Sequence, residues 1–159
     1  RGGYTGLVLI GATPDWAKPG CDPQSPWCAQ RSASAEAPPL VQDPRIKAAV
    51  IVDPLAMFFA ADELAGIKTP VFLWASEGGG DGVAPGDVAR VARSLPAMRD
   101  YRVAANAGHF AFLAPCSAAR TLVQPRLCVD PPGFDREAFH REFNAATAAF
   151  LKNTLHVVE

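Results

Sequence analysis

The chain has 159 residues and a formal net charge of −1, so it lacks the basic surface with which proteins bind nucleic acid. Hydrophobic residues make up 49% of it and charged residues 19%, which is enough apolar side chain for the core of one domain. No apolar run reaches the roughly 18 residues that a membrane-spanning helix needs, so we expect no membrane span.

The chain begins with a motif fragment that runs into an apolar stretch. Residues 4–12 are mostly small and apolar, and the preceding Gly2-Gly3 suits a close backbone approach, so we predict a buried helix here. Arg1-Gly2 fits the last two positions of G-x-S-x-G, the strand-to-helix turn that carries the nucleophile of α/β-hydrolases. In this register the nucleophile would precede Arg1, and the Arg1 backbone N–H would contribute to the oxyanion hole.

Residues 13–44 form a long stretch without periodicity, rich in Pro and small polar residues. Loops of this length in a compact domain are often functional, so we predict a disulfide-pinned excursion or a lid-like loop. Trp16 and Trp27 lie within it. Two interpretations of these tryptophans stay open: they anchor the loop by packing, or they line a substrate entrance.

Apolar strands and helices then alternate along the chain. Strands are predicted at residues 46–52, 71–75 and 101–104, and helices at residues 57–64, 86–95 and 135 to about 155. This order favours right-handed βαβ units and a parallel sheet. Because three strands make a narrow sheet with an uncovered edge at its first strand, we expect an N-terminal segment of the same protein to complete it.

The four cysteines fall into two close pairs, each in a turn-rich stretch. Neither pair has zinc-ligand spacing, so we favour two local disulfides, Cys21–Cys28 and Cys116–Cys128, over four free thiols. Each small loop would gain roughly 2.5–3 kcal/mol on a chain-entropy model. Disulfides persist in oxidising compartments, so a periplasmic or secreted protein is expected.

Asp81 and His109 are the candidate catalytic side chains. Each follows a predicted strand, and the carboxyl ends of parallel strands are where α/β proteins build their sites. The order of an upstream nucleophile, then Asp81, then His109 is that of a hydrolase triad, in which the acid orients the base. Asp53 and Glu77 are alternative acids. Ser76 is a weak candidate nucleophile, because its surroundings lack the remaining elbow residues.

Four segments carry a family resemblance. Residues 1–5 resemble the end of a Gly-His-Ser-x-Gly-Gly elbow, and residues 43–48 resemble the start of the strand that follows it. Residues 81–85 are similar to an acid loop in which Pro follows Asp four positions later, and residues 108–116 to a histidine loop. The chain thus resembles predicted dienelactone hydrolases, which are related to platelet-activating-factor acetylhydrolases. The resemblance implies the C-terminal part of an α/β-hydrolase fold, spanning residues 1–159.

The expected activity is carboxylic ester hydrolysis through an acyl-enzyme, and the resemblance implies no cofactor and no metal. The substrate would be a small-molecule ester, and Phe110 beside the base would line an apolar acyl pocket or simply belong to the core. The missing nucleophile is either Ser or Cys. The alternative is a non-catalytic binding module on a hydrolase-like fold, because a fold does not fix a chemistry.

Overall fold

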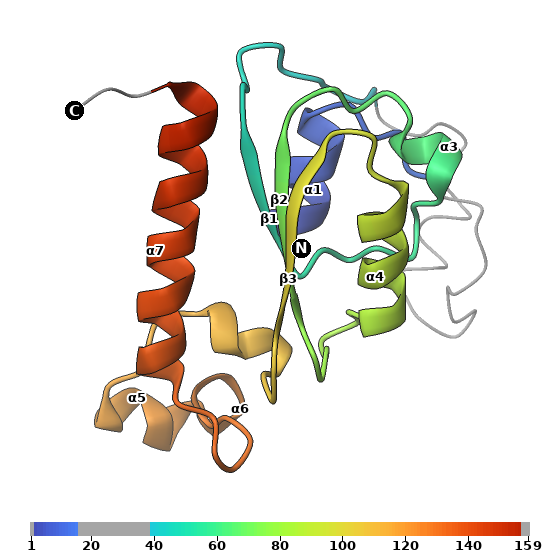
Figure 1. Ribbon diagram of the computed structural model, residues 1–159. Coiled ribbons are helices and arrows are strands. Elements are labelled where there is room, and N and C mark those ends of the chain that lie inside the picture. Colours follow the sequence, from blue (N-terminus) through green and yellow to red (C-terminus); the bar gives the residue numbers. More distant parts are fainter. Residues whose placement is uncertain (1, 16–38, 157–159) are drawn as a thin grey trace, which may run out of the picture.

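The computed structural model describes residues 2–15 and 39–156, which form a small α/β unit (Figure 1). In chain order its elements are α1 (Gly2–Leu9), β1 (Ala49–Val52), α3 (Ala61–Leu64), β2 (Val71–Ser76), α4 (Pro85–Ser94), β3 (Met98–Ala104), the 3₁₀ turn η1 (His109–Phe112), α5 (Ala118–Val123), α6 (Pro125–Cys128) and α7 (Arg136–Leu155). The strands form a three-stranded parallel sheet in the order β1-β2-β3. The predicted α/β class is therefore confirmed, and so are the strand positions to within a few residues.

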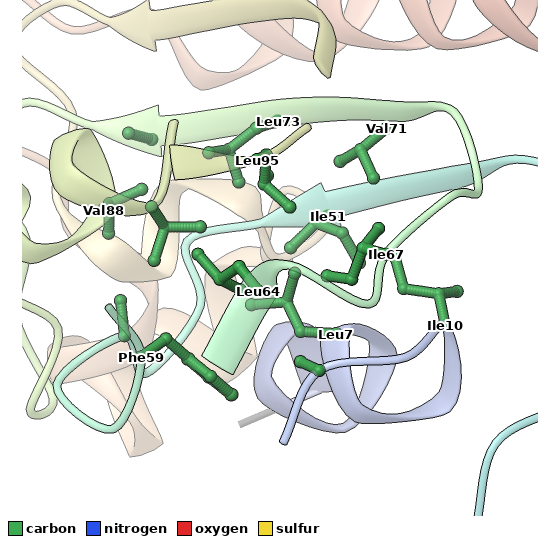
Figure 2. Close-up of a cluster of buried hydrophobic side chains, with 14 of the residues drawn as sticks. Leu7, Ile10, Ile51, Phe59, Leu64, Ile67, Val71, Leu73, Val88 and Leu95 are labelled. Atoms are coloured by element: carbon green, nitrogen blue, oxygen red, sulfur yellow. The ribbon is translucent and has the colours of Figure 1, made fainter. Parts of the chain in front are cut away.

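The central strand β2 is buried along its whole length because helices cover both faces of the sheet. Successive side chains of a strand point to opposite faces. Leu73 accordingly packs with Leu7 of α1 and Val88 of α4 on one face. Figure 2 shows these side chains converging between the sheet and the helices. The apolar run at residues 4–12 is thus a helix that supplies core, as its composition predicts.

The other face of the sheet packs against the long helix α7 through aromatic side chains. Phe72 and Trp74 of β2 lie 5.5 Å and 5.4 Å, between ring centroids, from Phe150 and Phe143 of α7. Trp74 also meets Phe139 edge-on at 5.9 Å. Aromatic pairs of this geometry each add about 0.5–1.5 kcal/mol beyond their buried area. These contacts fix α7 along the sheet (Figure 1).

Helix α7 begins at the predicted position, and Asp135 is its N-cap. The Asp135 side chain accepts a hydrogen bond of 2.9 Å from the Ala138 backbone N–H, which satisfies one of the N–H groups left free at a helix start. His156 ends the helix in the left-handed conformation, with φ of 54°.

The turn-rich segment between β3 and α7 folds into short regular elements. It contains η1 and two short helices, α5 and α6, and the predicted Cys116–Cys128 disulfide closes it. Arg136, at the start of α7, binds both carboxylate oxygens of Asp130 at 2.7 and 2.8 Å and donates to the Leu127 carbonyl at 3.0 Å. Bidentate, nearly buried pairing of this kind holds the closed segment against α7. Among the described helices, none has the length and apolarity to span a bilayer.

Candidate active site

Asp53 is a buried carboxylate at the carboxyl end of β1. It is 1% exposed, and its backbone N–H donates to the Trp74 carbonyl at 2.8 Å, so it continues the β1–β2 pairing by one residue. Its φ of 42° lies in the left-handed region, which Asp tolerates better than most residues. A charged side chain buried this deeply is costly unless its oxygens are hydrogen-bonded.

His109 is the partner of this carboxylate. Its Nδ1 lies 2.8 Å from Asp53 Oδ2, and its side chain is 18% exposed. Because a carboxylate only accepts hydrogen bonds, Nδ1 carries the proton in this contact and Nε2 is the basic nitrogen of the neutral ring. Within the described part of the chain, no hydrogen bond engages Nε2. This is the arrangement that a histidine acting as a general base requires.

Ser76, the last residue of β2, completes the hydrogen bonding of Asp53. Its backbone N–H donates to Asp53 Oδ1 at 2.9 Å, and its hydroxyl donates to Oδ2 at 2.6 Å. The hydroxyl oxygen in turn accepts from the Gly79 N–H at 3.1 Å. Ser76 is fully buried, so its hydroxyl is committed to the carboxylate and is not placed as a nucleophile.

The glycine-rich turn after β2 holds the backbone of His109. The His109 N–H donates to the Gly79 carbonyl at 2.7 Å, and the Gly78 N–H donates to the Ala107 carbonyl at 2.9 Å. Gly79 has a φ of +60°, and a Cβ there would overlap the Val83 carbonyl oxygen. Only glycine satisfies both constraints, so the turn is a built support for the imidazole.

The prediction that Asp81 orients His109 is corrected by this geometry, because the imidazole contacts Asp53. Asp81 follows the glycine turn with a φ of 51°, and its carboxylate lies 3.5 Å from the Arg126 guanidinium. Arg126 also lies over the Phe110 ring, 5.9 Å from its centroid. Phe110 itself contacts the His109 ring edge-on at 5.4 Å. Arg126 and Phe110 thus lie between the Asp81 carboxylate and the His109 ring in this chain of contacts.

Glu77, the other alternative acid, supports the loop that leads to His109. Its carboxylate accepts from the Asn106 backbone N–H at 2.7 Å, where Asn106 adopts a left-handed φ of 54°. The Asn106 side chain then donates to the Pro132 carbonyl at 2.9 Å. Glu77 thus ties the end of β2 to the turn after β3.

The first turn of α1 lies against the end of β1. A Cβ on Gly3 would be 2.7 Å from the Val52 carbonyl oxygen and 3.0 Å from Pro54 Cα, so only glycine allows this approach. The close backbone contact expected of Gly2-Gly3 is therefore present at Gly3. It brings the start of α1 next to the residues that flank Asp53, at the same edge of the sheet as His109.

The charge of Asp53 affects the pKa of Tyr101 in β3. The pKa of this tyrosine is raised, chiefly because the phenol is buried; Arg93 opposes the rise, and the negative charge of Asp53 adds to it. This charge would stabilise an imidazolium at His109.

Several predicted residues lie outside the described ranges. These are Arg1, Trp16, Trp27, Cys21 and Cys28. Within residues 2–15 and 39–156, no three His, Cys, Asp or Glu side chains gather as a metal-binding group would. Comparison with protein-family models, with curated proteins and with solved structures finds no match to this chain.

Proposed function

We propose that this chain carries the base and the acid of a carboxylic ester hydrolase that works through an acyl-enzyme. His109 is the base, Asp53 is the acid, and the nucleophile is the Ser or Cys immediately before Arg1. The observation that carries the proposal is the 2.8 Å contact between His109 Nδ1 and the buried Asp53 carboxylate. The close packing of Gly3 on the end of β1 supports the position of the nucleophile.

In this reaction Nε2 of His109 removes the proton from the nucleophile as it attacks the ester carbonyl carbon. The carbonyl oxygen becomes negatively charged, and the Arg1 N–H is proposed to donate to it. The imidazolium then gives its proton to the departing alcohol, which leaves an acyl-enzyme. Nε2 then removes a proton from water, which attacks the acyl carbonyl carbon, and the imidazolium returns that proton to the oxygen or sulfur of the departing nucleophile as the carboxylic acid is released. Asp53 keeps the proton on Nδ1 and stabilises the imidazolium in both steps.

The rest of the sheet is proposed to come from a preceding segment of the same hydrolase. In the described part of the chain β1 pairs only with β2, so its outer edge is free to accept another strand. The Cys116–Cys128 disulfide supports an oxidising compartment, and we propose that the protein is periplasmic or secreted.

The test uses the full-length polypeptide and a short-chain aryl ester. His109→Ala should lower kcat/KM by roughly a thousandfold or more, because the base is lost. His156→Asn, at the exposed end of α7, is the matched control and should leave turnover unchanged. A fluorophosphonate probe, mapped by peptide mass spectrometry, should label the residue before Arg1 if that residue is Ser. Normal turnover by His109→Ala, or labelling within residues 1–159, would refute the proposal.

A further inference from the structure

A closed ring of hydrogen bonds links the acid, the base and the turn between them. The Gly79 N–H donates to Ser76 Oγ at 3.1 Å, and the Ser76 hydroxyl donates to Asp53 Oδ2 at 2.6 Å. The same Oδ2 receives the bond from His109 Nδ1 at 2.8 Å. The ring closes where the His109 backbone N–H donates to the Gly79 carbonyl at 2.7 Å. The N–H and the carbonyl of one residue, Gly79, thus support both sides of the acid–base pair.

Ser76 is the member of this ring that the proposed reaction leaves without a role. Its side chain is fully buried, so it does not meet substrate. Its hydroxyl is nevertheless both donor and acceptor, and it shares one carboxylate oxygen with the imidazole. Its backbone N–H donates to the second oxygen, Oδ1, so Ser76 alone donates a hydrogen bond to each carboxylate oxygen of Asp53.

We infer that Ser76 is a positioning residue for the acid of the triad, an inference that rests on the proposed function. The Asp53 side chain can rotate about its torsions, but its hydrogen bond with the His109 imidazole requires Oδ2 to stay in one position. The Ser76 hydroxyl fixes Oδ2 against His109 and helps satisfy the buried negative charge. Without it, the carboxylate loses a donor, and the Gly79 N–H loses its acceptor.

The consequence should appear in the chemical step. Substrate does not touch Ser76, so KM should stay the same, while kcat falls because the imidazole is held less well in its reactive orientation. A hydrogen bond to a charged group is worth enough for the fall to be roughly ten- to hundredfold. If Ser76 were purely structural, its substitution would change the thermal stability but would not lower kcat while leaving KM unchanged.

The experiment compares Ser76→Ala and Ser76→Cys in the full-length polypeptide, with Ser94→Ala at the end of α4 as the control. Ester turnover gives kcat and KM, and proton NMR follows the downfield resonance of the Nδ1–H···Oδ2 bond. Ser76→Ala should lower kcat and shift that resonance, and Ser76→Cys, which keeps a weak donor, should fall between it and the parent. Ser94→Ala should match the parent in both measurements.

The inference fails if Ser76→Ala keeps parental kcat or leaves the resonance unmoved. If Ser76→Ala does not fold, Ser76→Cys decides: parental kcat and an unmoved resonance would overturn the inference, and a reduced kcat would support it. If the parent protein hydrolyses no ester, the proposed function fails. The positioning role is then judged by the resonance alone, which must still move in the Ser76 variant that folds.

Discussion

The Asp53 carboxylate lies 2.8 Å from the His109 imidazole, although 56 positions separate the two residues in the chain. Asp53 follows β1 and His109 follows β3, so both sit at the carboxyl edge of the parallel sheet with the tip of β2 between them. The first prediction concerns this pair. Asp53→Asn should lower kcat/KM for ester hydrolysis by roughly a thousandfold, because an amide at this position favours the wrong imidazole tautomer.

Asp81→Asn is the comparison for that prediction. Asp81 pairs with Arg126 at the surface, where the Arg126 side chain is 79% exposed, and such pairs are worth about 0–1 kcal/mol. Its kcat/KM should stay within about threefold of the parent protein. Asn tolerates the left-handed backbone at both positions, so neither change should strain the chain. Equal losses in the two variants would contradict the assignment of the acid.

The second prediction concerns the turn that braces His109. Gly79→Ala should lower the free energy of unfolding by about 1–3 kcal/mol and reduce turnover, because its Cβ would overlap the Val83 carbonyl oxygen at a left-handed φ. Gly86→Ala in α4 is the matched control, since a Cβ there meets nothing within 4 Å. That change should be neutral or stabilise by up to about 1 kcal/mol. Denaturant unfolding checks both, and a tolerated Gly79→Ala would show that the turn has room to move.

The third prediction concerns the disulfide after η1. The double variant Cys116→Ser/Cys128→Ser should lower the free energy of unfolding by about 2–4 kcal/mol, because a closed loop restricts the unfolded chain. The two cysteines are 12 positions apart, so the entropic gain is that of a short loop. Thermal and denaturant unfolding of the oxidised parent and the variant give the difference. An unchanged midpoint would mean that the Arg136 contacts alone hold the segment.

The fourth prediction concerns pH. Burial raises the pKa of Tyr4 to about 12, whereas an unfolded chain ionises tyrosine near 10. Between these values the unfolded state releases the proton first, so the free energy of unfolding should fall as the pH rises from about 10 towards 12. Tyr4→Phe should weaken that fall and leave the pH dependence below about 9 unchanged. Urea unfolding across this range is the measurement, and identical slopes in both proteins would contradict the burial effect.

The regular elements were predictable because their patterns are local. A few neighbouring residues are enough to predict each of them. Examples are the apolar runs of β1 and β2 and the Asp135 cap of α7. The helices α5 and α6 were not predictable, because they lie in a segment of irregular sequence that is held by the Cys116–Cys128 disulfide and by the contacts of Arg136.

The local sequence pattern could not decide which carboxylate is the partner of His109. Asp81 follows a predicted strand and resembles a family loop, and the sequence equally offers Asp53 directly after another strand. Glu77 and three glycines separate β2 from Asp81, and the Gly80–Val83 bridge folds that stretch back on itself. Only the folded turn shows Asp81 directed to Arg126 and Asp53 to His109. A usable signal was present: Asp53 ends an apolar strand with no intervening residue, where a buried charge needs a partner.

The position of Ser76 at the tip of β2 also sets a size limit. Its side chain has no exposed surface and contacts the same oxygen of the acid, Asp53 Oδ2, that the base contacts. A leucine or phenylalanine at this position would be too large for the space and would displace the carboxylate from the imidazole. Libraries that randomise this position should therefore return only the smallest side chains among functional clones, however tolerant the remainder of the strand proves.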